Sequence, residues 1–189
     1  MGILRGTRNL LIATGIVFLL QGILPRSFTL TFSLIPRLFM RGEVWRIFTY
    51  MFLHGGFFHI FFNMYVLYLF GNELEYFWGT REFIKYYFIC GAGAGFIYAL
   101  INFHSYIPVL GASGAIFGLL VAYGILFPER HIIIFPLFIP MKVKHAVILF
   151  GIIEFLGMMA GRDNIAHLAH LGGLLVGYLY LRYRRRRLY

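Results

Sequence analysis

Gly-Ala-Ser-Gly-Ala-Ile-Phe-Gly, residues 111 to 118, lies within the longest uncharged run of the chain, which extends from Tyr86 to Pro128. Ser113 stands in this stretch between small residues, so another backbone can approach its hydroxyl closely. One interpretation is helix packing, because small residues let transmembrane helices touch and serine can bond a neighbouring carbonyl group. The other interpretation is a reactive hydroxyl. The polar residues elsewhere in the chain decide between the two.

The composition indicates a polytopic α-helical membrane protein. The 189 residues are 60% hydrophobic and 13% charged, and the mean hydropathy is +0.79. Such values with repeated long uncharged runs exclude an ordinary soluble domain. The single cysteine, Cys90, excludes an internal disulfide framework and a cysteine-based zinc site. The formal net charge of +10 arises mostly at helix ends and in five arginines between Arg182 and Arg187, so we expect no nucleic-acid partner.

The uncharged runs predict a bundle of six transmembrane helices in a single membrane domain covering residues 1–189. A helix needs about 20 apolar residues to cross a hydrocarbon core of about 30 Å. The six predicted spans cover approximately residues 9–24, 50–72, 84–101, 112–127, 145–161 and 164–181. The fourth span is short, roughly 24 Å at ~1.5 Å per residue, so we expect it to begin below the membrane surface. Residues 182–189 form a basic tail.

Two connecting segments are too mixed to span the membrane. Residues 25–46 combine prolines and arginines with Phe, Leu and Trp45, which is typical of a first loop lying in the membrane interface. Residues 129–144 contain an apolar run interrupted by Pro136 and Pro140, so we interpret them as an interfacial loop.

The basic residues predict the orientation in the membrane. An even number of spans places both termini on one side. The termini and the links after the second and fourth spans carry 12 of the 17 Lys and Arg residues, and the other three loops carry five. Because cytoplasmic loops are enriched in Lys and Arg, we expect both termini in the cytoplasm of a multi-pass protein of the plasma membrane.

This orientation brings scattered polar residues to one level near the outer side of the membrane. Ionisable residues inside a membrane are costly and point to function when they gather. A lone histidine would more often be a satisfied core residue, but here the second, fourth and sixth spans contribute together. The set comprises His54, His59, Asn63, Ser113, His167 and His170.

The chemistry of this set favours nucleophilic catalysis. A serine hydroxyl needs a neighbouring base to take its proton, and His170 can do this and later protonate a leaving amine. The helix start at Ser113 leaves backbone N–H groups unpaired, which favours a developing oxyanion. His59 and Asn63 are spaced i, i+4, so both can point to that oxyanion.

A carboxylate that would orient the histidine is not evident from the sequence. Asp163 is the only acidic residue near the outer end of the sixth span, and it lies two helical turns from His170. We therefore predict a Ser–His dyad. Glu154 in the fifth span is open to three interpretations: a proton relay, a helix-pairing group, or a residue whose span is misplaced.

The same residues resemble the motifs of the rhomboid family of intramembrane serine proteases, from Trp45 to Gly177. Gly111-Ala-Ser-Gly114 resembles its Gly-x-Ser-Gly nucleophile motif. His170 followed by Gly173 and Gly177 resembles its sixth-helix motif. Further matches are the His-x4-His-x3-Asn pattern, the Trp-Arg pair of the first loop and a structural Glu-x3-Gly, found here as His54, His59 and Asn63, Trp45 and Arg46, and Glu75 and Gly79.

The resemblance implies roles for individual residues. Ser113 would be the nucleophile and His170 the general base and acid. His59, Asn63 and the Ser113 backbone N–H would form the oxyanion site. Phe117 would stack on the catalytic histidine where some members have tyrosine, and His167 would be a neighbour without an essential role. Supporting positions would be Gly111, Gly114, Gly173, Gly177, Trp45, Arg46, Glu75 and His54.

The resemblance also implies the substrates. They would be single-span or polytopic membrane proteins in the lipid bilayer, cut in or beside a transmembrane segment by a site that opens to the external side. The fifth span, with Phe150, Phe155, Met158 and Met159, would be a gate toward the second span, although the same aromatic face suits lipid contact equally. No cofactor or metal is expected, and the sequence gives no oligomeric state.

Other classes of function remain open at this stage. The four histidines at the outer level could bind Zn²⁺, or the polar layer could conduct ions or protons. A relative that binds transmembrane helices without cutting them is a third alternative, although it would need neither Ser113 nor His170.

Overall fold

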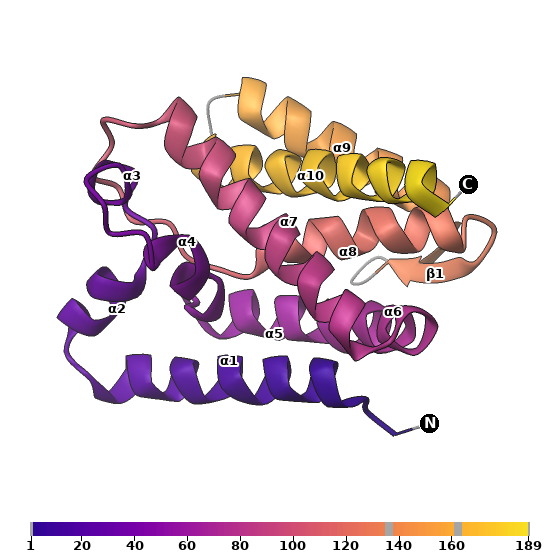
Figure 1. The fold of residues 1–189 in the computed structure, drawn as a ribbon, viewed down its shortest axis with the longest axis horizontal. Coiled ribbons are helices and arrows are strands. Elements are labelled where there is room, and N and C mark those ends of the chain that lie inside the picture. The colour runs from indigo at the N-terminus through magenta and orange to yellow at the C-terminus, as the bar shows by residue number, and fades with distance from the viewer. Residues whose placement is uncertain (1, 135–137, 161–163, 189) are drawn as a thin grey trace.

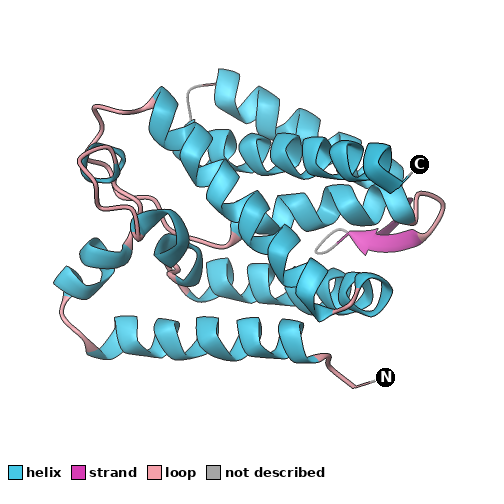
Figure 2. Ribbon diagram, viewed as in Figure 1, coloured by secondary structure: helices cyan, strands magenta, loops and turns pink. Residues whose placement is uncertain are grey.

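The computed structural model describes residues 2–134, 138–160 and 164–188, and within them it is a bundle of helices with one small hairpin (Figures 1 and 2). The helical membrane class predicted from composition is confirmed. In chain order the elements are α1 (Arg5–Ile23), α2 (Arg26–Phe32), α3 (Pro36–Phe39), α4 (Arg46–Thr49), η1 (Tyr50–Phe52), α5 (Phe57–Val66), η2 (Leu67–Gly71), α6 (Asn72–Trp78), α7 (Thr80–Ile101), α8 (Ser113–Leu126), β1 (His131–Ile134), β2 (Ile139–Lys142), α9 (Val143–Met159) and α10 (Asn164–Leu188).

Helix α8 is the centre of the bundle and packs against α7, α9 and α10. Its sequence is apolar all round, as is typical of a helix buried on every side, and Ala115, Leu119 and Ala122 are fully buried. Small residues bring its backbone close to its neighbours. A Cβ on Gly173 of α10 would fall on the Gly114 carbonyl, and one on Gly177 would lie 3.0 Å from Gly118 Cα.

The helix boundaries agree with the predicted spans to within a few residues for α1, α7, α8 and the described part of α9. The second span is different, because the chain does not form one helix from residue 50. A 3₁₀ turn ends at Phe52, and the helix restarts at Phe57 after a bend of 98°. It then continues through the π-helical turn η2 to Trp78. The last helix also extends beyond residue 181, so the basic tail is helical as far as Leu188.

Glu75 fixes α1 against this second helix. Its buried carboxylate accepts hydrogen bonds from the Gly6 and Thr7 N–H groups at 2.7 Å each, from the Thr7 hydroxyl at 2.8 Å and from the Thr80 hydroxyl at 2.6 Å. The first turn of a helix has N–H groups without partners inside the helix, and a carboxylate there is favoured. Glu75 therefore has a structural role in joining α1 to α6. Gly79 ends the helix that contains Glu75, with φ +79°.

The segment 25–46 contains the short helices α2 and α3, and a third short helix, α4, begins at its last residue. Arg46 is buried and donates to the carbonyl groups of Leu30 and Ser33 at 2.6 Å each and to the Glu43 carboxylate at 2.7 Å. Trp45 is 44% exposed and its ring N–H reaches the Thr31 carbonyl at 3.3 Å. The Trp-Arg pair thus binds carbonyl groups of residues 30–33 through both side chains, with Arg46 buried and Trp45 exposed.

Residues 129–144, which we interpret from the sequence as an interfacial loop, contain two short strands, β1 and β2. β1 and β2 pair antiparallel with Ile132 opposite Met141 and Ile133 opposite Pro140. Each strand of a two-stranded hairpin is an edge, so the missing N–H of Pro140 can face outward without breaking the ladder. Pro136 lies outside the described residues. Glu129 binds Lys142 and Lys144 beside the hairpin, and these two ammonium groups lower the pKa of its carboxyl group to about 2.

Candidate active site

Ser113 is the first residue of α8. The first hydrogen bond of this helix runs from the Ile116 N–H to the Ala112 carbonyl at 3.1 Å, so the N–H groups of Ser113 and Gly114 precede the bonded part of the helix. The chain enters the helix through Gly111, which has φ +129° and donates its N–H to the Tyr50 carbonyl at 2.9 Å. The predicted position of the serine at a helix start is therefore found.

His59 lies directly beside this entry. A Cβ on Gly111 would stand 2.8 Å from both Cε1 and Nε2 of the His59 ring, so the absence of a side chain at Gly111 makes room for the histidine. The Gly55 N–H donates to His59 Nδ1 at 3.3 Å. Because Nδ1 is an acceptor there, a neutral His59 carries its proton on Nε2. The ring therefore presents an N–H donor to the turn that precedes Ser113.

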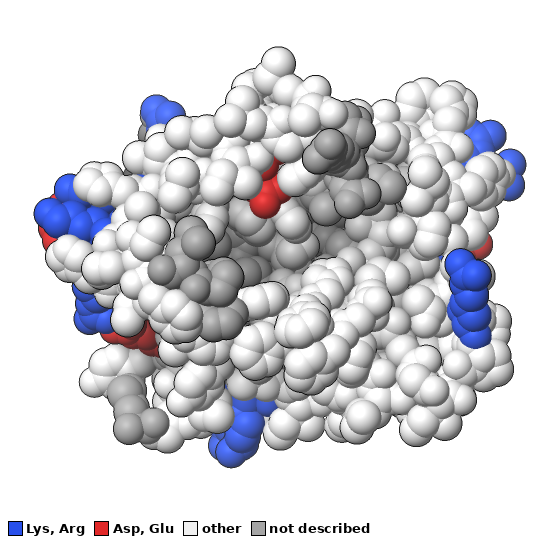
Figure 3. Space-filling model, turned by 180° about the vertical axis from the view of Figure 1, so that it is seen from behind, with Lys and Arg blue, Asp and Glu red and all other residues white. Residues whose placement is uncertain are grey.

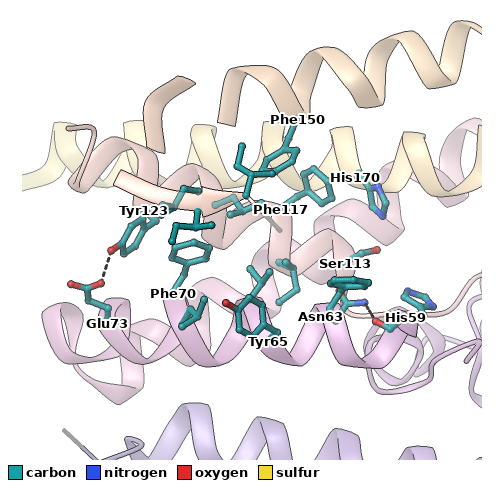
Figure 4. Close-up of a pocket in the computed structure, with 18 of the residues that line it drawn as sticks. His59, Asn63, Tyr65, Phe70, Glu73, Ser113, Phe117, Tyr123, Phe150 and His170 are labelled. Carbon is teal, nitrogen blue, oxygen red and sulfur yellow. Dashed lines mark hydrogen bonds between the residues drawn. The ribbon is translucent and has the colours of Figure 1, made fainter. Parts of the chain in front are cut away.

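Asn63 is one turn further along α5 and is buried. Its Nδ2 donates to the carbonyl of His59 at 2.8 Å, and Figure 4 shows the side chain on the same side of the helix as His59. An amide has two N–H donors, and this bond uses one of them. The i, i+4 relation predicted from the sequence is present.

His54 is not in the second helix as the sequence suggested. It lies in the break before α5, where Gln21 of α1 binds its backbone through the N–H at 2.9 Å and the carbonyl at 3.3 Å. Its ring stands edge-on to His59 with centroids 4.9 Å apart. The pattern of Gly55 and Gly56 was the available signal for this break, since two successive glycines weaken a helix. The His54 ring therefore packs against the His59 ring.

His170 of α10 and Ser113 of α8 line the same cavity. Phe117, one turn after Ser113, stacks on the His170 ring with centroids 4.4 Å apart and planes at 16°, as the resemblance implied. No hydrogen bond links Ser113 to His170 within the described residues, and such bonds often tighten only when substrate is present. In the view of Figure 4, Ser113 lies between His170 on one side and His59 with Asn63 on the other.

A carboxylate does stand beside the histidine, contrary to the expectation from the sequence. Glu154 of α9 places Oε2 3.0 Å from His170 Nδ1 and 2.5 Å from His167 Nδ1. All three side chains are mostly buried, at 12 to 22% exposure. Asp163 lies outside the described residues. The sequence missed this contact because Glu154 is on another helix, and its only signal was a single acid in an apolar span.

The cavity has a volume of about 730 Å³ and lies between α5, α8, α9 and the hairpin. Ser113 and His170 are at one end, and Glu73 with Tyr123 are at the other, where the Tyr123 hydroxyl donates to Glu73 at 2.6 Å (Figure 4). Its walls are mostly aromatic and aliphatic. Figure 3 shows a hollow in a mostly uncharged face, with most of the visible Lys and Arg residues toward the ends.

Among the predicted gate residues of α9, Met158 is half-buried, and the other three separate into two groups. Phe150 lines the cavity. Phe155 and Met159 are 50% and 69% exposed, as expected for a surface that meets lipid. Among the described residues, α1 and α7 are long and apolar enough to cross a membrane, and the bent pair formed by Arg46–Phe52 and Phe57–Trp78 would be a third crossing.

The fold and the site thus define a helical membrane protein with a serine at a helix start and a histidine at the same end of an apolar cavity. A family model for the rhomboid domain matches residues 41–187. The chain belongs to the rhomboid family.

Three relatives illustrate the similarity. "Putative rhomboid protease YdcA" of Bacillus subtilis is 34% identical over 143 residues, which is 73% of this chain and 66% of that protein. "RHOMBOID-like protein 1" of Arabidopsis thaliana is 35% identical over 149 residues, covering 75% of this chain and 36% of its own length. The human "Presenilin-associated rhomboid-like protein, mitochondrial" is 34% identical over 137 residues, covering 70% and 36%. The match therefore spans about a third of the two longer relatives.

Proposed function

We propose that this protein is an intramembrane serine endopeptidase that cleaves transmembrane segments of membrane proteins with a Ser–His dyad. Membership of the rhomboid family supports an intramembrane protease function. The observation that carries the proposal is the placing of Ser113 and His170 at the same end of one apolar cavity, with the His59 ring against the turn before the serine.

In the first half of the reaction, Ser113 Oγ attacks the carbonyl carbon of the scissile bond while its proton passes to His170. The carbonyl oxygen becomes an oxyanion, which the Ser113 backbone N–H, His59 Nε2–H and the free N–H of Asn63 stabilise by donated hydrogen bonds. His170 then gives its proton to the departing amine as the C–N bond breaks. This leaves an ester between Ser113 and the substrate carbonyl.

In the second half, water attacks the ester carbon and gives a proton to His170. The same donors hold the second oxyanion. When this intermediate collapses, the C–O bond to Ser113 breaks and His170 returns the proton to Oγ. The products are a carboxylic acid and an amine, and the enzyme is restored.

The proposal includes the arrangement in the membrane. The domain of residues 1–189 has six spans, among which α8, at 14 residues, is the short and recessed fourth. Both termini lie in the cytoplasm of a plasma-membrane protein, and the site opens to the external side. Substrates enter from the bilayer between α5 and α9. Phe150 is well placed to contact them, because it lines the cavity from the gate helix.

Purified protein in proteoliposomes tests the dyad with a fluorogenic single-span substrate. Ser113→Ala and His170→Ala should each abolish cleavage, because one removes the nucleophile and the other the base. His167→Ala should keep a substantial fraction and is the matched control one turn away. Activity lost in His167→Ala and kept in His170→Ala would overturn the assignment.

The same preparation separates the rival functions. A fluorophosphonate that labels Ser113 equally with and without a chelator would exclude a metal-dependent reaction. Ion flux in liposomes that depends on the histidines and Glu154 rather than on Ser113 would indicate a conducting protein. Binding of the single-span substrate without any cleavage or labelling would indicate a non-catalytic member of the family.

A further inference from the structure

Glu154 is the one described carboxylate that contacts the proposed base, and the dyad mechanism does not use it. Its Oε2 lies 3.0 Å from His170 Nδ1, yet this approach lacks the alignment of a hydrogen bond, so the buried Nδ1 has no aligned hydrogen-bond partner among the described residues. A buried N–H without a hydrogen bond costs free energy. The carboxylate is the group within reach that can remove this cost.

We propose that Glu154 is a positioning residue that holds His170 in the tautomer and orientation needed to deprotonate Ser113. This inference rests on the proposed function. Glu154 accepts the Nδ1–H of His170, which leaves Nε2 without a proton and able to take one from Ser113. When Nε2 gains that proton, the imidazolium stands beside a negative charge that stabilises it. The carboxylate itself stays ionised throughout, as in other serine hydrolases.

The Phe117 ring already restricts the orientation of the His170 ring. Phe117 stacks on one face with planes only 16° apart, which limits tilting of the ring. Rotation within the ring plane remains, and a partner at Nδ1 is what fixes it. Stacking and carboxylate contact therefore restrict different motions of the same ring, and they come from α8 and α9 respectively.

The competing interpretation is that Glu154 only pairs α9 with α10 through His167. That contact is the shorter one, at 2.5 Å, and α9 accommodates the His167 ring at Gly157, where a Cβ would collide with it. A purely structural pair would not require Oε2 to approach a second imidazole on the side facing the cavity. The two interpretations differ in which histidine carries the effect of Glu154.

The test uses the full-length protein in proteoliposomes with the fluorogenic single-span substrate. Glu154→Gln keeps the size and a hydrogen-bond acceptor for helix pairing but removes the charge. We expect kcat to fall about 100-fold with KM changed less than about threefold, a loss smaller than that of removing the base itself. Glu154→Asp keeps the charge and should restore part of kcat. The rate of fluorophosphonate labelling of Ser113 should fall in parallel with kcat.

The His167→Ala variant shows whether Glu154 acts on the reaction through His170 or through His167. Glu154→Gln should still lower kcat in the His167→Ala background, because the effect runs through His170, although the size of the loss will differ since Glu154 also contacts His167. An effect that disappears in that background would overturn the proposal, and so would an unchanged kcat with a lowered melting temperature. If Ser113→Ala or His170→Ala still cleaved, the proposed function would fail instead, which these variants report separately.

Discussion

Gly111 lacks a side chain at the point where the His59 ring needs the space. The residue has φ +129°, a conformation that residues with a Cβ rarely adopt, and a Cβ would stand 2.8 Å from two ring atoms of His59. Two independent constraints therefore require glycine. Both act on the turn that delivers Ser113 to the cavity.

Gly111→Ala should lower kcat by about 100-fold, because the displaced His59 would no longer present its N–H to the oxyanion. Gly56→Ala is the matched control, since a Cβ there would meet nothing within 4 Å and its φ of 166° is ordinary extended backbone. Cleavage of the single-span substrate measures both. Equal activity in the two variants would show that His59 is not needed in its present place.

Single residues also show how far the sequence can be interpreted. Ser113 and His170 could be predicted because each carries its signal locally, in flanking glycines at fixed spacing. The contact of Glu154 with His170 could not, because it depends on how α9 is rotated against α10. A helix that is apolar on all sides has no amphipathic stripe to reveal that rotation.

The elements that hold the site are α8 and α10, and they touch through glycines. Gly173 faces the Gly114 carbonyl so closely that a Cβ would fall on it. Since Ser113 and His170 are respectively one and three residues from these glycines, the same contact sets the separation of the proposed nucleophile and base. Close backbone approach at small residues is the usual basis of helix packing in membranes.

Gly173→Ala should lower the free energy of unfolding by about 1–3 kcal/mol, as is typical of overpacking, and should also push His170 away from Ser113. Thermal unfolding in detergent and the rate of Ser113 labelling measure the two effects. Gly151→Ala on α9 is the control, because its Cβ would meet only Leu174 Cδ1 at an ordinary 3.6 Å. A Gly173→Ala protein as stable and reactive as the control would contradict the close contact.

The sequence predicted the elements correctly where hydrophobic runs are continuous. It did not predict them where contacts between residues distant in sequence determine the local structure. The break before α5 depends on the Gln21 side chain binding the His54 backbone from α1. The hairpin depends on Arg130, which pairs with Glu73 of α6, donates to the Tyr123 hydroxyl at 3.0 Å and lies over the Phe127 ring. Gln21 is far in sequence from His54, and Glu73 is far from Arg130, so local propensity does not reveal these two contacts.

At the scale of the whole molecule, the distribution of charge predicts the orientation of the bundle in the membrane. Most of the Lys and Arg residues visible in Figure 3 lie toward its two ends, with a mostly uncharged face between them. The end with both termini also contains the hairpin (Figure 1), and the segments predicted to lie on that side of the membrane contain 12 of the 17 Lys and Arg residues. The positive-inside rule therefore supports the proposed orientation, with that end in the cytoplasm and the loop between α7 and α8 on the external side.

Single-cysteine reporters test this orientation in intact cells. Tyr106, in the α7–α8 loop, is 58% exposed, and the Glu129 side chain beside the hairpin is 61% exposed. The native Cys90 is fully buried and should give little background. An impermeant maleimide should label Tyr106→Cys in intact cells and Glu129→Cys only after permeabilisation. The reverse pattern would place the termini outside, and the cavity end with Ser113 would then open to the cytoplasm.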